Sequence, residues 1–303
     1  MTGPRHLDLS AYHTDLAEEM AAASTHTQVP GGEELLPTIN QRQINALHHK
    51  LNVPIPVIYQ GALQQGILPL RYLRNYPSLT ISEQLQLACK CVAVVGAGGL
   101  GGQVILCLTR VGVGRLIVVD PGRFEETNLN RQALCTPASL ELTKVHTAKN
   151  CVEELNPGVE VEMHPVRITP ENRADILAGA DVAVDALDSI QDRLVLEKGA
   201  KERGIPLVHA AIDGFFGQLM TVYPEDRGLG QIYGSQASPA SSLGNPPMTA
   251  LSMANLQAME VLKLLLGRGR TIRNQLLTLE LEEGLMELFS FPPLQLEPAG
   301  DER

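Results

Sequence analysis

Short apolar runs alternate with longer amphipathic stretches through the middle of the chain. The runs "CVAVVG" (91–96), "RLIVVD" (115–120), "VEVEMHPV" (159–166), "ADVAVDAL" (180–187), "PLVHAAI" (206–212) and "FGQLMTVYP" (216–224) are predicted strands. Between them, apolar residues at helical spacing predict helices over 100–111, 143–155, 170–179 and 189–203. Strands alternating with helices in this way favour an α/β fold, in which a mostly parallel sheet carries helices on both faces.

The last third of the chain has a different pattern. Residues 226–247 are rich in Gly, Ser and Pro and predict a long surface loop, a feature that is often functional. A strong helix is expected from 248 to 266, with Pro246 and Pro247 before it and Gly267 after it. The stretch 275–291 then predicts an antiparallel hairpin that turns at Glu283–Gly284.

The N-terminal part has weak periodicity. Residues 1–36 predict a mobile arm, and a short helix is expected to begin at a capping box in "TINQ" (38–41) and to be ended by Pro54 and Pro56. A second capping box in "TISE" (80–83) predicts a helix over 82–88. We therefore divide the chain into an arm with a short helical extension (1–65), a main domain (66–290) and a disordered tail (291–303).

Composition and charge narrow the class of protein. The 303 residues carry a net charge of −10, which argues against nucleic acid as a main ligand, because binding to phosphate backbones needs a basic face. No apolar stretch reaches the length of a membrane span, and "MTGPRHLDLS" has no signal-peptide core. We expect a cytoplasmic protein whose five cysteines, all between Cys89 and Cys151, are reduced thiols.

A glycine-rich turn follows the first strand of the predicted sheet. Gly96, Gly98 and Gly101 form G-x-G-x-x-G in "VVGAGGLGG", and Gly99 lies at the start of the next helix. Such a turn lets the backbone approach phosphate, while the helix N-terminus supplies positive charge. Asp120 ends the following strand, where a carboxylate can bind ribose hydroxyls. These residues alone indicate a nucleotide and would suit a nicotinamide-dependent dehydrogenase.

The polar residues that follow change this interpretation. Asn128, Arg131 and Gln132 lie on a loop after Asp120, and Lys144 begins the next helix. An arginine and a lysine near the turn suit a triphosphate, whose charge must be neutralised before its phosphorus can be attacked. Further on, "VDALDSIQDR" puts Asp185 and Asp188 at the end of a strand, where a carboxylate could hold Mg²⁺ on phosphate oxygens.

These motifs, in this order, resemble the ThiF/MoeB/HesA superfamily, the bacterial relatives of ubiquitin-activating enzymes. The resemblance runs from about residue 70 to 267 and includes "RYLRN" (71–75), "GAGGLG" (96–101), "NLNRQ" (128–132), "DALDS" (185–189) and "LQAMEVLKLLLG" (256–267). It implies a Rossmann-like domain that uses ATP and Mg²⁺ to adenylate a carboxylate. The usual substrate is the C-terminal glycine of a small ubiquitin-like sulfur carrier of the ThiS or MoaD type.

The resemblance also assigns roles to individual positions. Nucleotide would be held by Gly96, Gly98, Gly99, Gly101 and Asp120; phosphates by Asn128, Arg131, Gln132 and Lys144; and Mg²⁺ by Asp188. Arg74 matches an arginine that the family sends into the site of the neighbouring subunit, which implies a homodimer. Arg74, Arg131, Lys144 and Asp188 would be the catalytic set.

The sequence departs from the family in two ways, and alternatives stay open. The paired C-x-x-C motifs that hold structural zinc in many relatives are absent, so we expect no zinc. No cysteine lies in 226–247 or anywhere after Cys151, so we expect adenylation without a thioester. Other hypotheses are adenylation of a small-molecule or tRNA-borne carboxylate, a nicotinamide-dependent oxidoreductase, and a non-catalytic partner subunit. The carrier, the sulfur donor and the pathway, whether molybdopterin, tungstopterin or thiamine synthesis, are not defined by the sequence.

Overall fold

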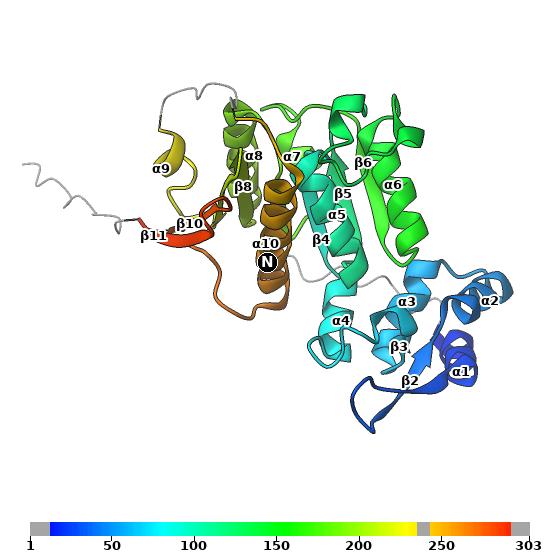
Figure 1. The fold of residues 1–303 in the computed structure, drawn as a ribbon. Coiled ribbons are helices and arrows are strands. Elements are labelled where there is room, and N and C mark those ends of the chain that lie inside the picture. Colours follow the sequence, from blue (N-terminus) through cyan, green and yellow to red (C-terminus); the bar gives the residue numbers. More distant parts are fainter. Residues whose placement is uncertain (1–12, 235–242, 292–303) are drawn as a thin grey trace, which may run out of the picture.

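The structure is a computed structural model that describes residues 13–234 and 243–291 (Figure 1). The helices are α1 (His13–Ala23), α2 (Gln41–Leu51), α3 (Ile55–Gln64), α4 (Ile81–Ala88), α5 (Gly99–Val111), α6 (Lys144–Leu155), α7 (Arg173–Ile176), α8 (Ile190–Arg203), α9 (Gly230–Tyr233) and α10 (Pro247–Leu266). The strands are β1 (Thr25–Gln28), β2 (Leu35–Ile39), β3 (Leu68–Pro69), β4 (Cys91–Val95), β5 (Arg115–Val119), β6 (Glu160–His164), β7 (Val182–Asp185), β8 (Leu207–Asp213), β9 (Phe216–Val222), β10 (Gln275–Glu280) and β11 (Leu285–Ser290).

The main sheet has eight strands in the order β11-β10-β9-β8-β7-β4-β5-β6. Strands β4 to β8 are parallel to one another, whereas β9 is antiparallel to β8 and β10 to β9. The antiparallel hairpin predicted over 275–291 is formed by β10 and β11. The chain runs from β4 outward to β5 and β6 and then returns to the other side of β4 as β7. The loops after β4 and β7 therefore diverge at the carboxyl edge of the sheet, which is where ligands bind in open α/β folds.

Helices cover both faces of this sheet (Figure 1). One hydrophobic core lies under α4, α5, α6 and α10 and includes Val104, Leu108 and Met253. The core on the other face lies under α7 and α8 and includes Leu177 and Leu196. The five residues of β4 are all buried, because this central strand is covered on both sides. The α/β expectation with antiparallel C-terminal strands is confirmed.

The prediction of a mobile arm over 1–36 is wrong for the residues that the structure describes. Residues 13–72 form an N-terminal unit with its own hydrophobic core, in which Leu16 and Met20 of α1 are buried. Strand β1 pairs with β2, and β2 with β3, so "THTQ" is ordered by a distant partner. The sequence signal was weak because α1 buries only two large side chains and β1 has no apolar alternation.

Several local predictions are also corrected. The capping box of α2 is formed by Asn40 and Gln43, because Thr38 pairs within β2. A further helix, α3, begins at Ile55 between the two prolines that were expected only to end its predecessor. The helix predicted over 170–179 is a single turn, α7. By contrast, the capping box of Thr80 with Glu83 is confirmed at α4. Residues 1–12, 235–242 and 292–303, which include nearly all of the predicted tail and part of the loop 226–247, lie outside the described residues.

Candidate nucleotide site

The glycine turn joins β4 to α5 with no room for side chains at two of its positions. Gly96 has a φ of +96°, and a Cβ there would lie 2.4 Å from the carbonyl oxygen of Ala186. A Cβ on Gly101 would lie 1.8 Å from the carbonyl oxygen of Gly96. The first turn of α5 therefore packs directly on the backbone of the turn, and its unpaired amides face the carboxyl edge of the sheet.

Asp120 is fixed beside this turn at the end of β5. Its carboxylate accepts hydrogen bonds from the amide of Ala97, at 2.8 Å, and from that of Gly122, at 2.7 Å. Lys144 begins α6 next to the same segment, since its amide donates to the Gly122 carbonyl. A Cβ on Gly122 would be 3.0 Å from Asp120 Oδ1 and 3.6 Å from Lys144 Nζ, so the carboxylate and the ammonium lie on the same side of the turn.

The loop 128–132 closes the front of the turn. A Cβ on Gly98 would meet Gln132 Nε2 at 3.6 Å, and one on Gly99 would meet Arg131 Cγ at 3.7 Å. Asn128 and Gln132 are buried, and the buried Oε1 of Gln132 has no hydrogen-bond partner among the described residues. Arg131 is half-buried and donates to neutral acceptors only, the Thr127 carbonyl and Asn130 Oδ1.

The two aspartates after β7 have different environments. Asp185 is fully buried, and its carboxylate contacts Arg193 Nη1 at 3.2 Å and His209 Nδ1 at 2.7 Å. Burial alone would raise the pKa of Asp185, but Arg193 and His209 hold it below its usual range. Asp188 is exposed, and no hydrogen bond or salt bridge joins it to another residue in 13–234 or 243–291. Of the two carboxylates proposed for Mg²⁺ from the sequence, only Asp188 is available.

The arrangement has the charge that a nucleotide triphosphate requires. Arg131 and Lys144 form no ion pair within the described part of the chain, although the Lys144 ammonium lies 5.9 Å from the centre of the Phe124 ring. The open glycine backbone, the Gln132 Nε2 group beside it and these two cations fit the phosphates of ATP, and the exposed Asp188 fits a magnesium ion that takes its other ligands from phosphate and water.

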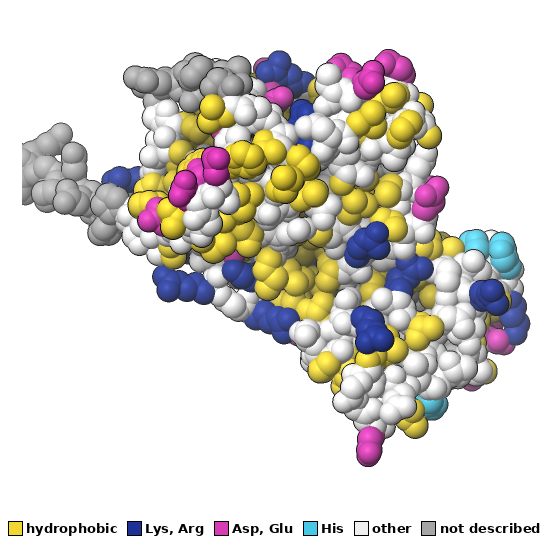
Figure 2. Space-filling view, viewed as in Figure 1, with side chains coloured by type: hydrophobic (Ala, Val, Ile, Leu, Met, Phe, Trp, Pro, Cys, Tyr) yellow, Lys and Arg dark blue, Asp and Glu magenta, His cyan; other side chains and the backbone are white. Residues whose placement is uncertain are grey.

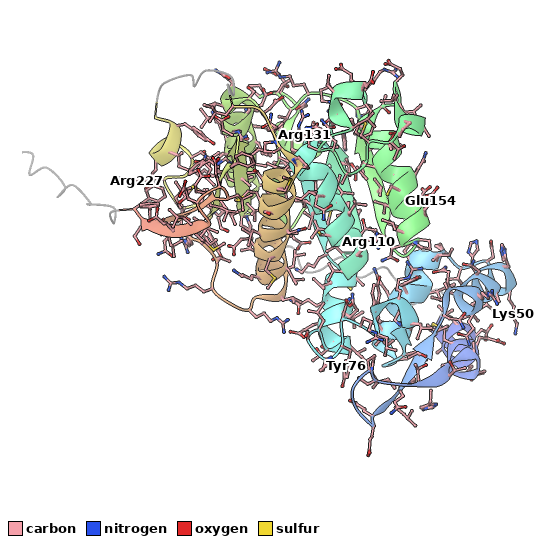
Figure 3. The ribbon with its side chains drawn as sticks, viewed as in Figure 1. Lys50, Tyr76, Arg110, Arg131, Glu154 and Arg227 are labelled. Carbon is pink, nitrogen blue, oxygen red and sulfur yellow. The ribbon has the colours of Figure 1, made fainter. Side chains whose placement is uncertain are left out.

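Arg74 lies away from these residues. It follows the turn η2 (Leu70–Tyr72), whose Tyr72 hydroxyl accepts from Asn156 directly after α6 and lies against Gly112 directly after α5. The glycine turn lies at the N-terminal end of α5, and Lys144 lies at the N-terminal end of α6, opposite the ends that Tyr72 contacts. The 13 residues of α5 span about 20 Å. Figure 3 shows Arg131 near one end of α5 and Tyr76, which is two residues from Arg74, beyond the other end. The predicted nucleotide residues thus lie at one edge of the sheet, and Arg74 lies apart from them.

Some contacts at this edge had no clear signal in the sequence. Arg193 and His209 come from α8 and β8 and meet Asp185 only through the sheet register. Asn130 Nδ2 donates to the carbonyl of Asn245, which brings the segment before α10 against the loop 128–132. The sequence shows only that Arg193 follows Asp185 by eight residues. Arginine and aspartate at such a spacing are common on protein surfaces, so the spacing did not predict a buried pair.

The five cysteines are free thiols. None of the five thiols is in a disulfide, and burial raises the pKa of each, that of Cys91 to about 11. The ranges 13–234 and 243–291 contain no cluster of three or more His, Cys, Asp or Glu that could hold a metal ion. Among the helices of the same ranges, none has the length and apolarity to cross a membrane.

Comparison with known proteins gives the family. The ThiF family model matches residues 72–297, and the chain belongs to that family. The chain is 37% identical over 203 residues to the SAMP-activating enzyme E1 of Haloferax volcanii, a match that covers 64% of this chain and 74% of that one. It is also 37% identical over 220 residues to the sulfur carrier protein adenylyltransferase of Thermus thermophilus, with 68% and 81% covered. A crystal structure of E. coli MccB with MccA has the same fold, with a TM-score of 0.65, 19% identity and 84% of each chain covered.

The glycine contacts generate a stability prediction. We expect Gly101→Ala to lower the free energy of unfolding by about 1–3 kcal/mol, because its Cβ would overlap the Gly96 carbonyl and force α5 off the turn. The matched control is Gly102→Ala on the same helix, whose Cβ would make ordinary contacts, at 3.4 Å with the Leu134 side chain and at 3.6 Å with the Ala97 carbonyl oxygen. Urea unfolding measures both. Equal stability of the two variants would show that the close approach is not a constraint.

Proposed function

We propose that the protein catalyses ATP- and Mg²⁺-dependent adenylation of a carboxylate, most simply the C-terminal glycine of a ubiquitin-like sulfur carrier. The observation that carries the proposal is the convergence of Arg131, Lys144 and Asp188, none of them in an ion pair, on the turn at Gly96–Gly101. A hydride-transferring enzyme has no use for such charges at the phosphates. Family membership and two relatives named for carrier activation support the same reaction.

The chemistry follows from charge neutralisation. ATP with Mg²⁺ supplies the α-phosphoryl group. A carboxylate oxygen attacks that phosphorus, the bond to the bridging oxygen of the β-phosphate breaks, and an acyl adenylate and pyrophosphate result. Both reactants are anionic, so Arg131, Lys144 and the N-terminus of α5 lower the barrier by neutralising charge and holding the two groups in line. We assign Asn128 and Gln132 to phosphate oxygens, Asp120 to ribose hydroxyls and Asp188 to Mg²⁺.

We further propose that the acyl group is not transferred to a cysteine of this chain. Attack on an adenylate requires a thiolate, and burial raises the pKa of every thiol here. Cys135 is the thiol nearest to the nucleotide residues in sequence, and its side chain is buried under the loop with Sγ 3.8 Å from the Glu125 carbonyl. The adenylate would therefore be released or attacked directly by a sulfur donor or an amine.

Substitutions at the site test this chemistry. We expect Lys144→Ala and Asp188→Ala each to slow carboxylate-dependent exchange of pyrophosphate into ATP by about 10²–10³, the usual effect of losing one preorganised electrostatic contact. Replacing all five cysteines with serine should leave the exchange largely intact. Lys149→Ala, also on α6 but paired on the surface with Glu153, is the control for loss of a lysine.

Two results would contradict the proposal. One is an exchange rate in Lys144→Ala that matches Lys149→Ala. The other is loss of exchange in Cys135→Ser while circular dichroism stays native, which would show that this thiol takes part in adenylation.

We also propose that the active form is a homodimer in which Arg74 enters the partner's site. Arg74 is exposed, forms no ion pair within the described residues, and lies far from the glycine turn of its own chain. Exposed apolar side chains on α10 and β11 offer a surface for association; they are Met248, Met259, Leu285, Met286, Leu288 and Phe289. Figure 2 shows hydrophobic side chains gathered over these elements, and Lys and Arg side chains along the border with the N-terminal unit.

Subunit mixing tests the role of Arg74. Arg74→Ala and Lys144→Ala should each be nearly inactive alone, and exchange of subunits between them should restore activity, because a heterodimer contains one intact site. With random exchange, half of the dimers are heterodimers, so about one quarter of the wild-type sites recover. Activity that stays at the level of the separate variants, although mass spectrometry detects heterodimers, would refute action across the interface.

A further inference from the structure

The segment that carries Asp188 runs from the end of β7 to the start of α8 and contacts a buried residue pair, Asp185 and Arg193. Asp185, the last residue of β7, is three residues before Asp188, and Ala186 and Leu187 lie between them. The Ala186 amide donates to the Val95 carbonyl at 3.0 Å, and the Ala186 carbonyl lies against Gly96. This segment is therefore the point at which the glycine turn and the proposed Mg²⁺ ligand meet.

Both backbone groups of Leu187 are taken by the buried pair. Its amide donates to Asp185 Oδ1 at 3.0 Å, and its carbonyl accepts from Arg193 Nη2. Arg193 Nη1 completes the link by contacting Asp185 Oδ2 at 3.2 Å. Asp188 itself has no side-chain hydrogen bond or salt bridge to the described residues, although its charge raises the pKa of Arg167. The contacts on Leu187 and the start of α8 therefore hold the backbone from which its carboxylate is presented.

The pair is in turn immobilised by the sheet. Arg193 Nη1 also donates to the Ala210 carbonyl at 2.8 Å, and His209 Nδ1 lies 2.7 Å from Asp185 Oδ2. With Nδ1 protonated, His209 Nε2 can accept from the Tyr233 hydroxyl at 3.1 Å, and that hydroxyl accepts from Gln218 at 2.8 Å. Asp185 and Arg193 are almost completely shielded from water, with 0% and 7% of their side chains exposed. Both carboxylate oxygens of Asp185 and both ring nitrogens of His209 have partners, and a buried network of this kind favours one geometry.

We infer that Arg193 and Asp185 are positioning residues that hold Asp188 ready for Mg²⁺ on the nucleotide. This inference rests on the proposed function, which gives Asp188 its ligand. The guanidinium is needed because it reaches a carboxylate and two carbonyls at once from a planar fork, which a lysine ammonium cannot do. Without the Arg193 guanidinium, the backbone at Leu187 and Asp188 loses this anchor, whereas Arg131, Lys144 and Asp188 keep their charges.

Arg193→Lys tests the inference with two readouts that do not depend on turnover. In the ligand-free protein, amide hydrogen exchange of the peptide containing Ala186–Ser189 should become at least tenfold faster, because Leu187 loses its clamp. In calorimetric titrations of ATP, the gain in affinity on adding Mg²⁺ should shrink about 10- to 100-fold, the usual effect of losing a partner that orients a metal ligand. The affinity for ATP in EDTA should stay within twofold of the wild type.

Two further variants keep the test decisive. Arg203→Lys replaces a surface arginine at the end of the same helix, outside the buried network, and it should leave both readouts unchanged. Asp185→Asn keeps an oxygen for the Leu187 amide and removes the charge that holds Arg193. It should shift both readouts in the same direction, and it decides the matter if Arg193→Lys does not fold.

The outcomes separate this inference from the proposed function. The inference is overturned if folded Arg193→Lys has wild-type rates of amide hydrogen exchange and a wild-type gain in ATP affinity on adding Mg²⁺. It is also overturned if ATP affinity falls equally with and without Mg²⁺, because that result indicates general damage to the site. If the wild type binds ATP with Mg²⁺ but never exchanges pyrophosphate, the proposed chemistry fails, and the two readouts still decide the role of Arg193.

Discussion

The close approach of α5 to the carboxyl end of β4 is the constraint on which the rest of the site depends. At Gly101 and Gly96 the backbones meet with no space for a Cβ, so the first turn of α5 lies directly on the glycine turn. That contact aims the helix amides at the edge where β4 and β7 diverge. It also brings Gly96 against Ala186, which ties the turn to the segment carrying Asp188. The residues proposed to bind nucleotide, after β5, at the start of α6 and in the loop 128–132, lie around the same point.

The site concentrates positive charge in an acidic protein. The chain carries a net charge of −10, yet Arg131 and Lys144 lie at the turn without a carboxylate partner in the described ranges. Cations without a carboxylate partner are costly to hold near one another unless an anion binds. Asp185 is not available to pair with them, because Arg193 and His209 contact its carboxylate. These unpaired charges support the proposed ligands, a triphosphate and a carboxylate.

The sequence predicted the sheet domain well because each of its elements is locally encoded. Strands such as β4 are continuous apolar runs bounded by glycine or aspartate, and α4 begins at a capping box that can be read directly from Thr80 and Glu83. The residues predicted to bind nucleotide lie close together because they follow β4, β5 and β7, parallel strands whose carboxyl ends share one edge of the sheet. The N-terminal unit was missed because α1 and β1 are ordered by contacts with α3 and β2, which no local pattern reveals. The Arg193–Asp185–His209 network was missed for the same reason, since it depends on the register of β7 against β8.

The account is tested most directly by looking for the product of the proposed first step. A small carrier protein ending in Gly-Gly is incubated with the enzyme, ATP and Mg²⁺, and the intact carrier is weighed by mass spectrometry. A second sample uses the same carrier with its C-terminal carboxylate converted to an amide. The account predicts an AMP adduct on the free carboxylate and none on the amide. The absence of an adduct on the free form, or equal adducts on both forms, would contradict adenylation of a carrier C-terminus.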